Sequence, residues 1–219
     1  HWSGLPRVPA GMRTIAQPSA LHGVQTDMTA AAVLDYDAEL MLRVKEGDES
    51  SFALLLGKHR APVIHFLYRM VRNHAIAEEL AQEVFLRVYR SRATYEPTAK
   101  FTTWLFRITT HMALNWLRDG KNEKMQARPD DETGEARAHE APDKRPSVEQ
   151  RLLYQVKLDE VRRAVSSLPG KQRAAVLMHK YEEMEYSQIA KVLGCSESAV
   201  KSLLFRAYET LRARLAHMV

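Results

Sequence analysis

The sequence predicts an all-α protein in which two helical domains are joined by a flexible linker. Beyond residue 28, apolar side chains recur almost throughout at the three- and four-residue spacing of amphipathic helices. The apolar–polar alternation of strands between Gly or Asn turns is absent. A stretch from residue 120 to 147 lacks both patterns and divides the helical part in two.

The composition limits the class of protein. A chain of 219 residues is long enough to bury one or two cores. Its net charge of +5 suits a nucleic-acid partner without proving one, because ordinary proteins also carry such a charge. The one cysteine, Cys195, excludes an internal disulfide framework and a cysteine-based zinc site, and indicates a reducing cytoplasm. The apolar runs are too short to cross a bilayer, which takes about 20 residues.

The first 27 residues differ from the rest of the sequence. They contain three prolines and show neither helical periodicity nor the apolar segment of a secretory signal. We interpret residues 1–27 as a disordered leader or as the artefact of an upstream start site.

A first helical domain is expected over residues 28–119. Either Asp35 or Asp37 can cap its first helix, which is predicted to run through Val44 and to end at Gly47.

Three longer helices follow in the same domain. The second spans residues 49–71, and Pro62 predicts a kink in it or a break into two helices. Asn73 caps the third, which continues to about Arg90, and the fourth covers residues 101–118. The apolar stripe of the third helix has Phe85 beside it and consists of Ile76, Leu80, Val84 and Val88.

Residues 120–147 are predicted to be a flexible acidic linker. The stretch holds three prolines and few large apolar side chains, and its middle is rich in Asp and Glu. Such a segment cannot bury enough apolar surface to offset the entropy lost on ordering.

The second domain, residues 148–219, is predicted to hold four helices. The first ends at the Leu-Pro-Gly sequence that finishes at residue 170, and the second covers residues 170–181. A short helix over residues 187–193 leads through a turn to a last helix that ends near His217.

The last two helices have the pattern of a helix-turn-helix. Ala190 is small enough to let the second helix cross closely, and Gly194 suits the left-handed conformation of the turn. Val200 can fill the core between the helices, and Ser196 is a good N-cap. An ordinary helical hairpin is the alternative.

The second helix of this motif offers a polar face to DNA. Lys201 and Arg206 can bond guanine edges or phosphates, while Phe205 can touch a thymine methyl group or simply pack. The expected DNA-facing side chains are Glu197, Ser198, Lys201, Ser202, Phe205 and Arg206.

Four stretches, residues 77–89, 101–108, 167–173 and 186–214, carry motifs that occur in this order in one family. Together they resemble the extracytoplasmic-function (ECF) sigma factors, which direct bacterial RNA polymerase to promoters. Residues 186–214 resemble the C-terminal domain of these proteins, and residues 167–173 are similar to the segment that begins it. Residues 77–89 resemble the helix that docks on the polymerase clamp, and residues 101–108 resemble the helix that opens the −10 element. The resemblance covers residues 37–215.

The resemblance implies an alternative sigma factor of the sigma-70 family. The first domain corresponds to sigma region 2 and the second to sigma region 4, reading the −35 element. The implied partners are core RNA polymerase, through its β′ clamp and β flap, promoter DNA and an anti-sigma factor. We expect a cytoplasmic protein that is not an enzyme and needs neither cofactor nor metal.

The resemblance also implies two sets of site residues in the first domain. The expected polymerase contacts are Glu79, Gln82, Glu83 and Phe85. The loop from Tyr95 to Lys100 should form the pocket for a flipped non-template base, since aromatic, amide and cationic groups can hold unstacked bases. The alternative for Trp104 is a place wholly in the core. The expected −10 contacts are Tyr95, Lys100, Phe101, Thr103, Trp104, Arg107, Asn115 and Arg118.

The sequence departs from the family in the DNA-reading helix. Arg is frequent in the family where Lys201 and Leu203 stand, and a lysine cannot copy the bidentate guanidinium fork. A free-standing helix-turn-helix regulator is the competing hypothesis. An enzyme is disfavoured, because the sequence has no Gly-rich phosphate loop and its histidines lack metal-ligand spacing.

Overall fold

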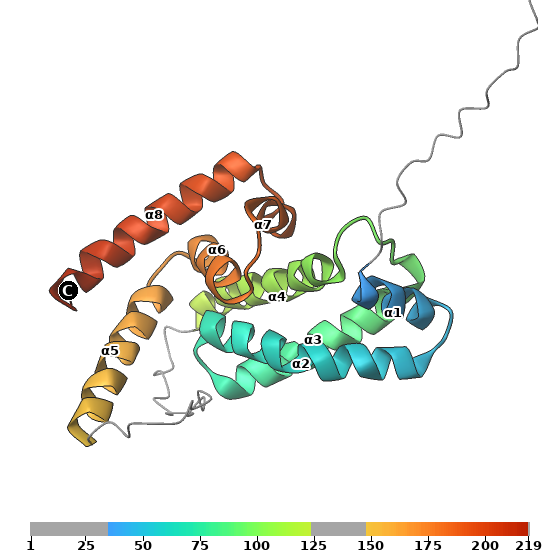
Figure 1. Cartoon of the computed structure of the whole chain (residues 1–219), viewed down its shortest axis with the longest axis horizontal. Coiled ribbons are helices and arrows are strands. Elements are labelled where there is room, and N and C mark those ends of the chain that lie inside the picture. The colour runs from blue at the N-terminus through green and yellow to red at the C-terminus, as the bar shows by residue number, and fades with distance from the viewer. Residues whose placement is uncertain (1–34, 124–147, 219) are drawn as a thin grey trace, which may run out of the picture. The chain divides into compact units, whose positions relative to one another are not determined.

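The computed structural model describes residues 35–123 and 148–218, in which all regular structure is helical and no strand occurs. The predicted all-α fold is confirmed for these residues (Figure 1). The predicted leader, residues 1–27, and residues 124–147 of the predicted linker lie outside the described residues.

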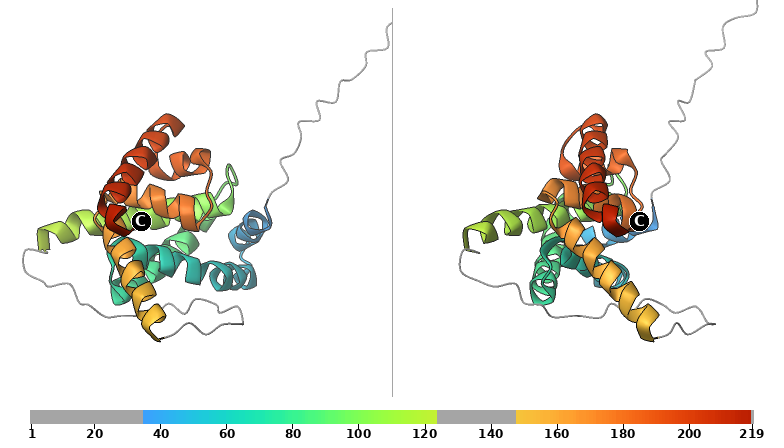
Figure 2. Two further views of the ribbon diagram at one scale, coloured as in Figure 1. Left: turned by 60° about the vertical axis from the view of Figure 1, so that its left-hand side comes forward. Right: turned by 90° about the vertical axis from the view of Figure 1, so that its left-hand side faces the viewer.

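The first four helices form a bundle. They are α1 (Tyr36–Lys45), α2 (Glu49–Val71), α3 (His74–Arg90) and α4 (Phe101–Glu123), and a 3₁₀ helix, η1 (Ser91–Thr94), follows α3. Figure 2 shows α2, α3 and α4 side by side, and each contacts the other two. Helix α1 packs on α2.

Side-chain caps fix where these helices begin. Asp35, not Asp37, is the N-cap of α1, and its Oδ1 accepts from the Ala38 N–H at 2.7 Å. Asn73 caps α3 as predicted, with its Oδ1 3.0 Å from the Ile76 nitrogen. Asp37 lies inside α1, where it is buried.

One predicted helix bound was wrong, and one of the two outcomes expected at Pro62 does not occur. Helix α2 has the predicted bounds and runs through Pro62 without a break. A proline inside a helix costs about 3 kcal/mol, whereas each large apolar side chain that is buried contributes roughly 1.5–3 kcal/mol. Six apolar residues after Pro62 in α2 are buried, which outweighs the lost hydrogen bond. Helix α4 continues to Glu123, five residues beyond the predicted end.

The last four helices are α5 (Val148–Ser166), α6 (Gly170–Tyr181), α7 (Tyr186–Leu193) and α8 (Glu197–Leu215). A short 3₁₀ helix, η2 (Ala216–Met218), follows α8. Helix α8 packs against α5, α6 and α7.

The two sets of helices also contact each other within the compact unit that begins at residue 34. Helix α7 packs on α4, and α6 packs on α2 and α4. Gly170, the first residue of α6, lies so close to α4 that a Cβ there would be 2.9 Å from Leu114 Cδ2. The guanidinium of Arg173 donates to the backbone oxygens of Met70 in α2 and of Leu168 before α6.

Candidate nucleic-acid and polymerase interfaces

Helices α7 and α8 have the geometry of a helix-turn-helix. Gly194 ends α7 in the left-handed conformation, with φ of 63°. The Ser196 hydroxyl accepts from the Ala199 N–H at 3.2 Å, which makes Ser196 the N-cap of α8. Ala190 and Val200 are both buried between the helices. The predicted turn, cap and core residues of this motif are therefore confirmed.

The face of α8 opposite this core is exposed to solvent. Phe205 is 66% exposed, so the alternative in which it packs inside the protein is wrong. The Ser202 hydroxyl donates to the Ser198 carbonyl at 3.1 Å, which leaves its oxygen free to accept from a ligand. Exposed side chains are found at all six predicted positions: Glu197, Ser198, Lys201, Ser202, Phe205 and Arg206.

These exposed side chains include two cations, Lys201 and Arg206, and one carboxylate, Glu197, which stands four residues before Lys201. In the part of the chain that the structure describes, neither Lys201 nor Arg206 makes a salt bridge. Arg212, farther along α8, is 2.6 Å from Glu209 Oε1. Lys201 and Arg206 are thus free to contact a ligand, whereas the charge of Arg212 is offset by Glu209.

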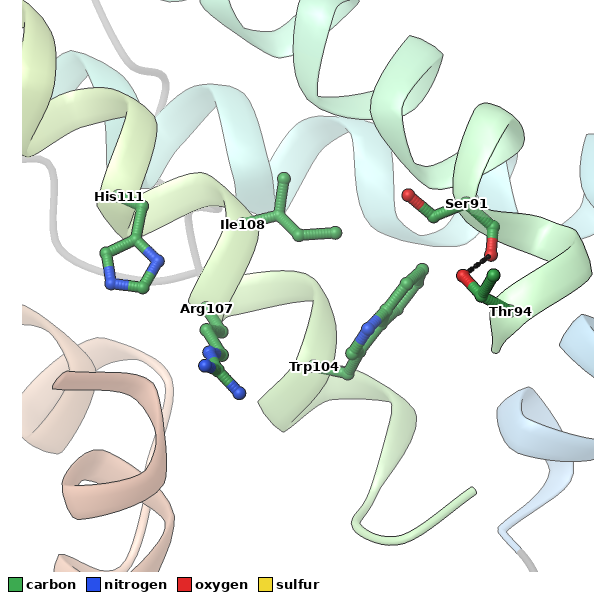
Figure 3. A pocket seen from close by; sticks show the side chains of 6 residues that line it. All are labelled: Ser91, Thr94, Trp104, Arg107, Ile108 and His111. Carbon is green, nitrogen blue, oxygen red and sulfur yellow. Dashed lines mark hydrogen bonds between the residues drawn. The ribbon is translucent and has the colours of Figure 1, made fainter. Parts of the chain in front are cut away.

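A cavity of about 240 Å³ lies between η1 and α4. Figure 3 shows the Trp104 ring facing η1, with Ile108 beside it and Arg107 and His111 farther along α4. The cavity is smaller than the roughly 300–1,000 Å³ pockets of drug-sized ligands. Its lining consists of Ser91, Thr94, Trp104, Arg107, Ile108 and His111.

Trp104 has one side in the core and another in this cavity. Its ring meets the rings of Tyr95 and Phe101 at centroid distances of 4.9 and 5.8 Å. It is half-buried and lines the cavity, so it is not wholly a core residue. A planar ligand in the cavity would meet an aromatic surface that is already held in place from behind.

The predicted −10 residues divide into a buried and an exposed set. Tyr95, Phe101 and Thr103 are 2%, 0% and 3% exposed, so in this structure they support the cavity rather than line it. Burial, followed by the charges of Asp35 and Asp37, raises the pKa of Tyr95 to about 12. The exposed set is Lys100, Arg107, Asn115 and Arg118.

Helix α7 is the reason that Thr103 is covered. The side-chain nitrogen of Gln188, in α7, is 3.5 Å from the Thr103 hydroxyl, and α7 packs along α4. DNA can reach Thr103 only if α7 moves away from α4.

Four cavity residues were missed by the sequence analysis: Ser91, Thr94, Ile108 and His111. A signal for two of them was present in the sequence. Trp104, Arg107, Ile108 and His111 stand at i, i+3, i+4 and i+7, which places them on one helical face. Ser91 and Thr94 belong to another element, and their place beside Trp104 depends on the packing of α3 on α4.

The predicted polymerase contacts lie on α3. Glu79 and Gln82 are exposed, and Glu83 is half-buried with its Oε1 3.1 Å from Arg87 Nε. Phe85 is only 6% exposed and belongs to the core. The sequence analysis missed Leu86, a large apolar side chain of the same helix that is 48% exposed.

No group of His, Cys, Asp and Glu side chains with the arrangement of a metal site occurs among residues 35–123 and 148–218. In the same residues, no helix is long and apolar enough to span a membrane.

Two family models match the chain. The sigma-70 region 2 model matches residues 55–123, and the sigma-70 region 4 model matches residues 158–211. The first match covers the cavity and the second covers the helix-turn-helix.

Relatives and solved structures agree with these matches. RNA polymerase sigma factor CarQ of Myxococcus xanthus is 35% identical over 179 residues, 81% of this chain and 97% of CarQ. The ECF RNA polymerase sigma-E factor of Haemophilus influenzae is 30% identical over 189 residues, 82% of this chain and 95% of that protein. The fold is similar to that of CnrH in its complex with the cytosolic domain of CnrY, with a TM-score of 0.63, 19% identity and coverage of 84% of this chain and 99% of that chain. The chain therefore belongs to the ECF group of the sigma-70 family and is an alternative RNA polymerase sigma factor.

Proposed function

We propose that this sigma factor brings core RNA polymerase to promoters by reading the −35 duplex with α8 and by holding an unstacked −10 base in the cavity beside Trp104. The observation that carries the proposal is the cavity, in which Trp104 and Arg107 combine an aromatic surface with a cation. The chain itself performs no catalysis in this role, and its place of action is the cytoplasm, where polymerase transcribes.

The −35 role rests on the exposed face of α8. A recognition helix in the major groove meets base edges with its N-terminal half. Lys201 and Ser202 lie in that half, and Arg206 follows one turn later. Lysine and arginine bond guanine O6 and N7, and serine hydroxyls bond either kind of base pair, so this face suits direct reading of the duplex. Phe205 adds an apolar surface for a thymine methyl group.

The −10 role rests on the cavity and on the exposed cations around it. A base that leaves the duplex loses its stacking, and an aromatic side chain can replace that stacking at about 1–3 kcal/mol per base. Trp104 supplies the ring, Arg107 can meet the phosphate or the base edge, and His111 offers ring nitrogens at the far wall. Lys100, Asn115 and Arg118 extend the polar surface along α4.

The surface for the polymerase clamp is proposed on α3. Glu79, Gln82 and Leu86 are exposed on neighbouring turns, so an apolar side chain is surrounded by polar ones. This pattern suits a protein interface in which a small apolar centre has a polar rim. We place Phe85 behind this surface, as a core residue that supports it. The second polymerase contact, with the β flap, falls to the last four helices.

An anti-sigma partner is also proposed. CnrH was solved with the cytosolic domain of CnrY, and the sigma factor RpoE of Bartonella quintana, similar in fold at a TM-score of 0.56 and 21% identity, was solved with the anti-sigma factor NepR. A partner of that kind would bind this chain while α7 covers Thr103.

Reconstituted transcription tests the proposed function. Core polymerase is incubated with this chain and a library of promoter fragments, and the transcripts are sequenced. We expect start sites that share a −35 and a −10 element, and none of them with core polymerase alone. Arg107→Ala should impair opening of the −10 element, whereas Arg60→Ala, an exposed arginine on α2, serves as the matched control. Tight binding of duplex DNA without polymerase, and no binding of polymerase, would instead support the free-standing regulator.

A further inference from the structure

Helix α1 contacts both ends of the loop that leads into the cavity helix. Lys45, the last residue of α1, donates from Nζ to the backbone oxygen of Tyr95 at 3.1 Å. Asp35, the N-cap of α1, accepts from the backbone N–H of Phe101 with its Oδ2 at 3.1 Å. Tyr95 and Phe101 directly flank the loop residues 96–100, so a helix about 15 Å long joins the two ends of this loop.

The Asp35 carboxylate serves two helices at once. Its Oδ1 accepts from the Ala38 N–H at 2.7 Å and so caps α1, while its Oδ2 binds the first N–H of α4. A carboxylate is a strong acceptor at helix N-termini because its charge faces the positive ends of the helix dipoles. The relative position of the first turns of α1 and α4 is therefore set by one side chain.

Helix α1 is itself held firmly on the bundle. Asp37 is 6% exposed and binds Lys58 Nζ at 2.8 Å and His59 Nε2 at 2.9 Å, both in α2. Four apolar residues of the same helix are buried: Ala38, Leu40, Met41 and Val44. Since these contacts hold α1 in place on α2, the Asp35 and Lys45 side chains are held in place as well.

The two held ends of the loop lead directly to the cavity wall. The Tyr95 and Phe101 rings both pack on Trp104, and the His59 ring lies 5.3 Å from the Phe101 ring. Within the loop, the one backbone hydrogen bond among those described runs from the Thr98 N–H to the Glu96 oxygen, at 2.8 Å. The loop thus has little internal structure to fix its shape, and its ends depend on α1.

We infer that α1 is a brace that sets the shape of the −10 loop, residues 96–100 in the segment predicted to hold a flipped −10 base, with Asp35 and Lys45 as positioning residues that do not touch DNA. A binding loop that is already ordered loses less entropy when a ligand binds, and it rejects ligands that do not fit its fixed shape. Loss of the brace therefore lowers discrimination among bases at the −10 element more than it lowers polymerase binding. The inference rests on the proposed function, because it assigns the brace to that same −10 site.

Asp35→Asn and Lys45→Met test the brace with little disturbance elsewhere. Asparagine is as good an N-cap as aspartate, but its NH₂ group takes the place of one carboxylate oxygen and cannot accept, so Oδ1 and Oδ2 are no longer both available to Ala38 and Phe101. Lys45→Met keeps the aliphatic chain and removes the donor to Tyr95. The matched controls are Asp48→Asn, at the N-cap of α2, and Arg43→Met, on the exposed side of α1. Lys45→Arg keeps a donor and should retain wild-type behaviour.

The measurement is transcription by holoenzyme on promoters that carry each of the four bases at each −10 position. Each hydrogen bond lost contributes about 1 kcal/mol, so we expect the ratio between the best and the next-best base to fall about fivefold in each variant. It should fall further in the double variant, with polymerase affinity within twofold of wild type. Thermal unfolding is measured in parallel.

Unchanged discrimination in both variants would overturn the brace, as would an equal loss in the two controls. The same holds if activity falls on all promoters alike and follows the unfolding temperature, because the contacts would then only stabilise the fold. A failure of the proposed function looks different, because the wild-type holoenzyme itself would then show no preference among −10 bases.

Discussion

The helix-turn-helix and the −10 cavity differ in how their side chains come together. The exposed face of α8 takes its candidate contacts from one helix, with Lys201 and Ser202 on one turn and Arg206 on the next. The cavity needs η1 and α4 together, and its aromatic wall is held by Tyr95 from the loop between them. A surface of the first kind follows from local spacing, whereas a surface of the second kind depends on how distant segments pack.

This difference also affects how each surface tolerates change. Side chains on α8 project into solvent, so substitution there should change DNA binding and leave the fold intact. The residues behind the cavity are buried, so substitution there changes folding and function together.

The largest effect is expected for Trp104→Ala. Loss of the ring removes stacking of about 1–3 kcal/mol for a captured base and leaves a gap against Tyr95 and Phe101. Open-complex formation should fall by about 5- to 150-fold, measured by permanganate reactivity of −10 thymines, and the unfolding temperature should fall as well. Arg107→Ala, an exposed cavity residue, should impair opening without the loss of stability. Normal opening by both variants would remove the cavity from the −10 site.

A smaller and purely functional effect is expected on α8. Lys201→Ala or Arg206→Ala should weaken −35 recognition by roughly 1–3 kcal/mol if each side chain bonds a base. Footprinting of holoenzyme on promoters with single −35 substitutions measures this, and the unfolding temperature should not change. Arg214→Ala, exposed near the C-terminal end of the same helix, is the control. An equal loss on all −35 sequences would indicate contacts with phosphates rather than bases.

Local signals explain what the sequence predicted well. Asn73, Ser196 and Gly194 act through neighbouring backbone groups, so caps and turns could be placed without knowledge of the fold. The face of α8 followed from the helical period once Val200 was assigned to the core.

Tertiary packing explains the rest. The burial of Phe85 and Thr103, and the exposure of Leu86, depend on which helices cover α3 and α4. Ser91 belongs to the cavity only because η1 lies beside Trp104. No spacing rule within one helix contains this information.

Gly170 and Gly194 are glycines for different reasons: Gly170 because a neighbouring helix is close, and Gly194 because its backbone is left-handed. At Gly170 an added Cβ would be 2.9 Å from Leu114 Cδ2, so Gly170→Ala should displace the end of the Leu114 side chain and loosen the contact of α6 with α4. The cost should be about 1 kcal/mol, the low end of overpacking, because the atom belongs to a flexible side chain. At Gly194 there is space for a Cβ, but φ is 63°, so Gly194→Ala should cost about 1–2 kcal/mol through backbone strain alone. Urea unfolding measures both free energies.

Gly170→Ala and Gly194→Ala should also differ in which helices exchange their amide hydrogens faster. Gly170→Ala should loosen the packing that places α7 over Thr103, and amide hydrogen exchange in α4 should increase. Gly194→Ala should speed exchange in α7 and α8 only. Equal exchange patterns would mean that α6 does not control the cover over α4. Gly57→Ala, in the exposed middle of α2 with space for a Cβ, is the control.

The smallest effect is a pH dependence of stability that originates behind the cavity rather than in the helix-turn-helix. Burial lowers the pKa of His59 below its usual 6.5, and the hydrogen bond and charge of Asp37 offset this only in part. As the pH falls, His59 is therefore protonated in the unfolded chain before it is protonated in the folded chain. The free energy of unfolding should then decrease as the pH falls from 7 towards 5. His59→Gln should flatten the dependence of the free energy of unfolding on pH between 7 and 5, whereas His65→Gln, at an exposed histidine of the same helix, should leave it unchanged.

Because His59 packs on Phe101, the same acidification should loosen the −10 loop before it affects α8, which hydrogen exchange of the two segments can resolve. A slope that survives in His59→Gln would assign the pH dependence to other groups.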